Sequence, residues 1–150
     1  MKAIVMVGCL ALILVSCGSR EPLVVKQFTV REVNPDWSED LMVRGEVQKR
    51  LYGAVEQSER EKRKGQYYSV RWRANPAGGA VKVRFQYRQA ATGSPVQELL
   101  QTVGAQAGTG VVEFSVVGES YLKGGRVLAW RMVLAQGGQD LAEKKSFLWE

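Results

Sequence analysis

Histidine is absent from this 150-residue chain, and its only cysteines are Cys9 and Cys17. Without histidine, the chain lacks the base of Ser-His-Asp and Cys-His nucleophile systems, the usual proton shuttle at neutral pH and the commonest metal ligand. Zinc, haem and iron–sulfur sites also lose their usual ligands when histidine and free cysteine are both missing. We therefore expect no metal and no cofactor.

Glycine-rich phosphate loops are missing too, although the chain has 16 glycines. Neither GxxxxGK[ST] nor GxGxxG occurs, so the glycines do not form a known nucleotide-binding motif. A pair of glutamates could still serve glycoside hydrolysis, but most acidic residues have basic neighbours in charge-rich segments. We expect a protein that is not an enzyme.

The N-terminus combines Lys2 with an apolar run over residues 3–15. This pattern is typical of a secretory signal peptide. A bilayer-spanning helix needs about 20 apolar residues, and Arg20 and Glu21 end the run before that length. The alternatives are an ordinary signal peptide with a chance cysteine and, less favoured, a transmembrane anchor.

Residues 14–17, Leu-Val-Ser-Cys, resemble the lipobox of bacterial lipoproteins. The resemblance implies cleavage after Ser16, a diacylglycerol on Cys17 and, usually, acylation of the new amino group. Two or three acyl chains anchor a protein stably, whereas one binds a membrane only marginally. Gly18 stands where Asp would retain a lipoprotein at the inner membrane, so we expect lipid anchoring with the outer membrane favoured, facing the periplasm or the cell surface.

The expected domain organisation is a signal peptide (1–16), a lipidated tether (17–22) and one domain (23–150). Cleavage leaves 134 residues with a formal charge of +5, because Lys2 is the only charged side chain removed. That length suffices for one domain with a hydrophobic core. No intrachain disulfide is expected, since Cys9 leaves with the signal peptide and Cys17 carries lipid.

Helix signals extend over about residues 36–64. Asn34 or Asp36 can cap the N-terminus, and acidic residues near the start with basic residues near the end match the helix dipole. One apolar face is predicted from residues spaced by four, namely Val43, Val47, Leu51 and Val55. Internal glycines weaken the helix, and a break near Gly53 is the alternative.

The rest of the domain has the alternation of β-strands. A first strand is expected at 23–33, and six more follow with turn residues between them, at 67–74, 81–88, 96–103, 111–117, 126–135 and 141–149. No helix-length segment separates the last six, so the sheets should be antiparallel. The predicted fold is mainly β: a seven-stranded antiparallel immunoglobulin-like sandwich with one helix inserted between the first and second strands.

Alternation also predicts which side chains point inward. Three inner rows are expected, namely Tyr68, Val70, Trp72 and Ala74; Val81, Val83, Phe85 and Tyr87; and Leu128, Trp130, Met132 and Leu134. We expect Trp149 in the core beneath the last strand and Trp37 packing the inserted helix onto the sandwich.

Two stretches resemble fibronectin type III domains. Val70, Trp72 and Pro76 followed by residues 81–88 look like the family's second and third strands, and residues 121–130 are similar to its leucine-and-glycine corner. The resemblance covers about residues 66–136 and departs at Leu128, which replaces the corner tyrosine, and at the inserted helix. It implies a fold that hosts many functions rather than one activity.

The outer faces of the second and third strands are basic, with Arg71, Arg73, Lys82, Arg84 and Arg88. If the two strands share a sheet or meet at a corner, these residues form a basic stripe that attracts an anionic lipid, a glycan or an acidic protein. The alternative is a solvated face whose charges protect a sheet edge. Tyr121 and Tyr67 are the candidate exposed aromatic contacts.

The expected function is that of a non-enzymatic, membrane-anchored envelope lipoprotein acting as a protein-interaction or structural module. Its partners would be the membrane, through the lipid anchor, and another envelope protein or assembly. The alternative is a ligand-binding lipoprotein that captures a glycan or other anionic polymer through the basic face. Nucleic acid is not expected as a partner at this location, although Tyr67 lies beside basic residues.

Overall fold

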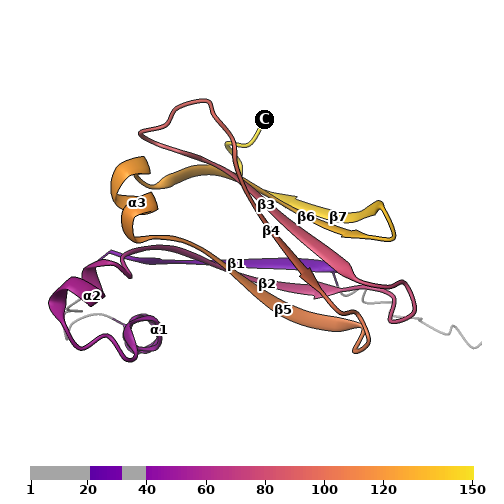
Figure 1. The fold of residues 1–150 in the computed structure, drawn as a ribbon, viewed down its shortest axis with the longest axis horizontal. Coiled ribbons are helices and arrows are strands. Elements are labelled where there is room, and N and C mark those ends of the chain that lie inside the picture. Colours follow the sequence, from indigo (N-terminus) through magenta and orange to yellow (C-terminus); the bar gives the residue numbers. More distant parts are fainter. Residues whose placement is uncertain (1–20, 32–39) are drawn as a thin grey trace, which may run out of the picture.

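Seven strands form two packed antiparallel sheets in the computed structural model, which describes residues 21–31 and 40–150 (Figure 1). The first sheet has the order β1-β2-β5 and the second the order β4-β3-β6-β7. The first comprises β1 (Leu23–Val30), β2 (Gly65–Arg73) and β5 (Thr109–Val117); the second comprises β4 (Gln97–Val103), β3 (Val81–Gln89), β6 (Val127–Gln136) and β7 (Gln139–Lys145). The predicted immunoglobulin-like sandwich is confirmed.

The core lies where the inner rows of β2 and β3 meet. The predicted inner residues of both strands are buried, apart from Ala74, which is half-buried beyond the end of β2. The rings of Tyr68 and Phe85 lie 4.6 Å apart across the two sheets, and Phe114 lies 5.4 Å from Phe85. Such aromatic pairs contribute about 0.5–1.5 kcal/mol each beyond their area burial. A period of two was thus sufficient to predict this part of the core.

Strand β6 departs from the predicted inner row. Met132 and Leu134 are buried as expected, but Trp130 is only half-buried and Leu128 is 40% exposed. Trp130 still packs against the core, with its ring 5.8 Å from that of Tyr68. Leu128 is exposed because of a register shift between β3 and β6, where Gln89 pairs with Val127 instead of Leu128. The shift places Val127 in the core in the position expected for Leu128.

The segment inserted between β1 and β2 contains two helices, α1 (Leu41–Leu51) and α2 (Gln57–Glu61). The predicted helical insertion between β1 and β2 is confirmed in outline, and it is divided near Gly53, as the alternative expected. Gly53 has a φ of 81°, a left-handed conformation that ends a helix and that glycine adopts without strain. Asp40 caps α1 by accepting a hydrogen bond from the Met42 N–H at 2.6 Å.

The apolar face predicted for this insertion is only half formed. Val47 is buried and Leu51 half-buried, whereas Val43 is 38% exposed and Val55 is 83% exposed. The turn at Gly53 breaks the four-residue spacing before Val55. Residues 34–37, which include both expected caps and Trp37, lie outside the described residues.

Two further segments differ from expectation. The stretch expected as a loop before β6 contains a short helix, α3 (Gly118–Gly124). The last strand ends at Lys145, so Trp149 lies beyond β7 rather than in its core row. The half-buried Trp149 ring instead lies 5.0 Å from the guanidinium carbon of Arg88, which points outward from β3. The C-terminus therefore folds back over the outer face of the second sheet.

The sandwich has two chemically different ends. The tether end is where β1 begins at Leu23 and where the loops 74–80, 104–108 and 137–138 lie; the helical end is where β1 ends at Val30 and where α1, α2 and α3 lie (Figure 1, right and left). None of the three tether-end loops contains a charged residue. Gly137 and Gly138 both have positive φ, 60° and 81°, as the predicted tight hairpin between β6 and β7 requires.

Candidate functional site

The five basic residues predicted to form one stripe lie on opposite sides of the sandwich. Arg71 and Arg73 point outward from β2 in the first sheet, and Lys82, Arg84 and Arg88 point outward from β3 in the second. The outer faces of two packed sheets point away from each other. The predicted basic stripe therefore does not form, because the chain crosses from one sheet to the other between β2 and β3.

On the second sheet, several of the outward basic residues have partners. Arg84 lies 3.7 Å from Asp140 on β7, and Arg88 lies over the Trp149 ring. The neighbouring strand adds another ion pair, Arg131 with Glu143 at 2.8 Å. Positive and negative charges alternate here, which agrees with the solvated-face alternative for this sheet.

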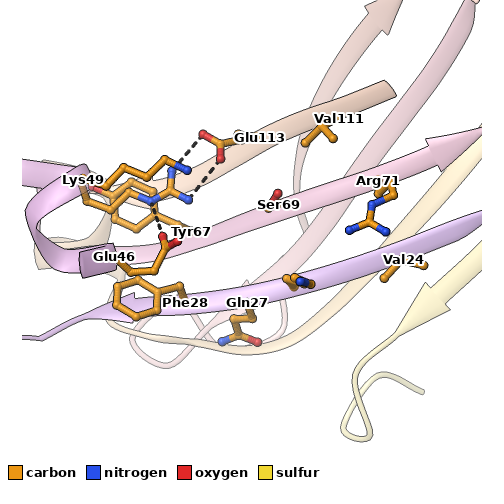
Figure 2. A pocket seen from close by; sticks show the side chains of 12 residues that line it. Val24, Gln27, Phe28, Glu46, Lys49, Tyr67, Ser69, Arg71, Val111 and Glu113 are labelled. Atoms are coloured by element: carbon orange, nitrogen blue, oxygen red, sulfur yellow. Dashed lines mark hydrogen bonds and ion pairs between the residues drawn. The ribbon is translucent and has the colours of Figure 1, made fainter. Parts of the chain in front are cut away.

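The outer face of the first sheet holds a hollow of about 340 Å³ (Figure 2). We call it the Ser69 hollow. Its lining comes from β1, β2, β5 and α1, and consists of Val24, Lys26, Gln27, Phe28, Glu46, Lys49, Arg50, Tyr67, Ser69, Arg71, Val111 and Glu113. Of the predicted basic residues, only Arg71 lines it.

The size of one side chain explains why the sheet is hollowed at this point. Ser69 is the outward residue at the middle of β2, the central strand, and it pairs with Lys26 on β1 and with Glu113 on β5. Tyr67 and Arg71 are the outward residues on either side of it along β2. A small serine surrounded by four long side chains leaves a depression whose floor is the strand itself.

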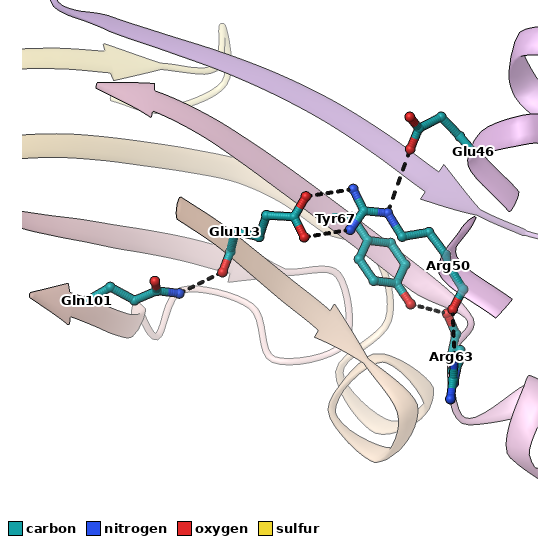
Figure 3. Close-up of polar contacts among 6 residues, drawn as sticks. All are labelled: Glu46, Arg50, Arg63, Tyr67, Gln101 and Glu113. Atoms are coloured by element: carbon teal, nitrogen blue, oxygen red, sulfur yellow. Dashed lines mark hydrogen bonds and ion pairs between the residues drawn. The ribbon is translucent and has the colours of Figure 1, made fainter. Parts of the chain in front are cut away.

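Arg50 forms the wall on the helical side (Figure 3). Its guanidinium donates two hydrogen bonds to Glu113, at 2.9 and 3.2 Å, and its carbon lies 4.6 Å from the centre of the Tyr67 ring. Glu46, one turn earlier on α1, lies 3.8 Å from Arg50 Nε. The Arg50 side chain is only 10% exposed. Its ion pair with Glu113 and its contact with the Tyr67 ring join α1 to the sheet.

A second arginine fixes the end of α1. Arg63 donates hydrogen bonds to the carbonyl oxygens of Arg50 and Tyr52, at 3.1 and 2.5 Å. The Tyr67 hydroxyl in turn donates to the Arg63 carbonyl at 2.7 Å. The two bonds from Arg63 satisfy carbonyls at the C-terminus of α1, which have no partners within the helix.

The Ser69 hollow has an excess of positive charge. Both carboxylates of the hollow, on Glu46 and Glu113, interact with Arg50. The hydrogen bonds that Arg50 donates to Glu113 are the main reason that the pKa of Glu113 is lowered. Within the described residues, no carboxylate lies within ion-pair distance of Lys26, Lys49 or Arg71. Four basic and two acidic residues line the hollow, so two positive charges are in excess.

Neither predicted aromatic contact is a freely exposed ring. Tyr67 is half-buried beneath Arg50, and burial raises its pKa. Tyr121 is half-buried on α3 and lines a second hollow, of about 510 Å³, together with Arg31, Arg126 and Leu128.

Sequence reasoning missed Lys26, Phe28, Lys49 and Ser69. Alternation in residues 23–30 places Lys26 and Phe28 on one face, but their position beside β2 depends on how β1 pairs. Lys49 reaches the hollow only because α1 docks there. No local signal in the sequence indicates that docking.

Comparisons with protein-family models, with curated proteins and with solved structures find no match to this chain. Across residues 21–31 and 40–150, the structure has no helix that is long and apolar enough to cross a bilayer. The same residues include no group of three or more acidic or cysteine side chains placed to hold a metal ion. Cys17 lies outside the described residues, so its lipidation stays a prediction.

Proposed function

We propose that this protein is a non-enzymatic lipoprotein of the bacterial cell envelope, anchored through Cys17, and that it acts as a protein-interaction or structural module. The lipobox-like sequence supports the location. The absence of histidine, of free cysteine in the mature chain and of nucleotide-binding motifs supports a binding role rather than catalysis. The outer membrane is the favoured site, because Gly18 follows the cysteine.

The observation that carries this function is the strong exposure of large apolar side chains at the helical end. Five large apolar side chains there are between 67% and 86% exposed, namely Leu41, Met42, Tyr52, Val55 and Leu122. Charged residues of both signs surround them on α1, α2 and α3. Exposed apolar side chains within a polar rim are typical of protein–protein contact surfaces.

The position of this surface supports the same role. A lipid on Cys17 would be joined to Leu23 by only five intervening residues, 18–22, which reach about 18 Å when fully extended. The tether end would then lie near the bilayer, and the helical end would point away from it. A partner in the periplasm or on the cell surface would meet the helical end first.

Site-specific photocrosslinking in the native cells tests this proposal. A photoreactive residue at Tyr52 or Leu122 should give a discrete crosslinked product. The same residue at Ala77, in a tether-end loop, or at Leu100, on the outer face of the second sheet, should not. Products of equal yield at all four positions, or none at the helical end, would overturn the proposed interaction surface.

The second candidate function is capture of a glycan or other anionic polymer. The Ser69 hollow favours it, because it is lined by three basic side chains, Lys26, Lys49 and Arg71, that have no ion pair among the residues that the structure describes. This differs from the stripe expected from the sequence, since only Arg71 belongs to both. An anion-binding role for the first sheet is compatible with a protein partner at the helical end.

A further inference from the structure

We propose that the Ser69 hollow binds an anionic glycan, with Lys26, Lys49 and Arg71 contacting its carboxylate or phosphate groups. This proposal gives the second candidate function a defined site and a ligand class. The choice of a glycan rests on that function, whereas the anion site itself rests on the geometry of the first sheet.

The three basic side chains lie around one residue, Ser69, and therefore form one site. Lys26 is the direct cross-strand partner of Ser69, and Arg71 is the next outward residue along β2. Lys49 extends from α1 on the side where Arg50 contacts Glu113 (Figure 2). An anionic group above Ser69 is therefore approached by basic side chains from β1, β2 and α1.

Arg50 keeps this site positive. If Glu46 and Glu113 were unpaired, their charges would offset those of the cations around Ser69. Arg50 instead holds Glu113 through two hydrogen bonds and lies 3.8 Å from Glu46.

The walls of the hollow favour a sugar ring over a bare ion. Phe28 and Tyr67 are cross-strand partners, and both are half-buried at the end nearest α1. The volume of about 340 Å³ lies at the lower end of the range for small-molecule sites, about 300–1,000 Å³. The Phe28 ring beside a hydroxyl and cations suits a ring with apolar C–H faces, hydroxyl groups and an acidic substituent, whereas Arg50 covers the Tyr67 ring.

The surroundings favour a polymer over a lipid headgroup. Beyond Arg71, the next outward residue of β2 is the exposed Arg73, so the basic row continues past the hollow. The hollow opens on the side face of the sandwich and extends from α1 to Val24, Arg71 and Val111 near the tether end, whereas a lipid on Cys17 would hold only that end at the bilayer. A chain of acidic sugars can follow the strand, with one unit in the hollow and another near Arg73.

Calorimetric titration of the full-length protein in detergent tests the proposal. The probes are tetragalacturonate, which carries carboxylates, a phosphorylated oligomannose, a neutral maltotetraose and a tetraglutamate peptide. At least one acidic glycan should bind, more weakly as salt rises, and maltotetraose should not bind. Binding to tetragalacturonate alone would identify carboxylate as the recognised group, and binding to the oligomannose alone would identify phosphate.

Substitutions then locate the site. Lys26→Gln and Arg71→Gln should each weaken binding by about fivefold or more, corresponding to about 1 kcal/mol per base. Lys82→Gln and Arg84→Gln, on the second sheet, should change it less than twofold. Ser69→Phe should abolish binding by filling the hollow without altering charge. Ser115→Phe is its matched control, because Ser115 also points outward on the first sheet but does not line the hollow.

Four results would overturn the proposal. No binding of either acidic glycan would exclude the site, and equal binding of maltotetraose would exclude recognition of charge. If the variants of the first sheet and those of the second sheet lost equal affinity, the glycan would be attracted to the whole basic surface rather than to the hollow. Tetraglutamate that binds more tightly than both glycans, with the same dependence on Ser69, would make the ligand an acidic peptide. The photocrosslinking result does not depend on any of these outcomes, so each proposal can fail alone.

Discussion

At the scale of single residues, Trp72 and Gly110 fit closely together in the core. They are cross-strand partners on β2 and β5, and a Cβ added to Gly110 would lie 2.5 Å from the indole ring. Gly110→Ala should therefore destabilise the fold by about 1–3 kcal/mol through overpacking. Trp72→Ala should cost more, about 3–5 kcal/mol, because it leaves a cavity. Urea unfolding measures both, and a Gly110→Ala variant with wild-type stability would contradict this packing.

Also at the residue scale, the Arg50–Glu113 contact predicts a pH dependence of stability. The pKa of Glu113 is lowered in the folded state, chiefly by the hydrogen bonds from Arg50. Its stabilisation is therefore complete above the ordinary glutamate pKa, about 4.3, and is lost as the pH falls through the lower folded value. Because Glu113 is 47% exposed, Glu113→Gln should cost only about 0.2–1 kcal/mol at pH 7, and less at pH 3.

Urea titrations at the two pH values measure this difference. Glu119→Gln is the control, since the Glu119–Lys123 pair is almost fully solvated, with side chains 78% and 77% exposed. A loss for Glu113→Gln that is as large at pH 3 as at pH 7 would show that the effect is not the ion pair.

At the scale of elements, an internal glycine weakens α1. It contains Gly45, where an added Cβ would meet nothing within 4 Å. Gly45→Ala should therefore stabilise the helix by about 0.5–1 kcal/mol and slow amide exchange in α1 by about two- to fivefold. Hydrogen exchange of the monomeric protein measures this. Exchange at random-coil rates across α1 in both proteins would contradict its docking through Arg50.

Gly53→Ala is the matched control for that experiment. Its added Cβ would also meet nothing within 4 Å, but its φ of 81° disfavours any side chain. The variant should therefore exchange faster than the wild type at the end of α1. Equal effects of the two substitutions would mean that backbone conformation is not what separates α1 from α2.

The strands also differ in how far the local sequence predicts which of their side chains point inward. The inner rows of β2 and β3 followed from alternation, because a two-residue period is a local property of a strand. The inner row of β6 did not, because Leu128 is displaced by a register shift that arises only when β6 pairs with β3. The site was predicted least well: Arg50 and Glu113 are 63 residues apart in sequence, and only the docked helix brings them together.

At the scale of the whole molecule, membrane attachment should depend on Cys17. Cys17→Ala should release the protein from membranes, because the apolar run before it is too short to span a bilayer. Cys9→Ala, inside the predicted signal peptide, should leave attachment unchanged. Fractionation after a high-salt wash measures both, and a Cys17→Ala protein that stays with the membrane would place the anchor elsewhere.

The path of the chain through β1 has a mechanical consequence for the proposed lipid anchor. Strand β1 begins at Leu23, the first residue after the predicted tether, and ends at Val30, before the inserted helices. A pull between a lipid-held N-terminus and a partner on α1 would run along the covalent backbone of this one strand. An extended strand has almost no slack, so it would carry the load with little lengthening. Strands β2 to β7 would lie outside the path of the force, and the sandwich could transmit tension without unfolding.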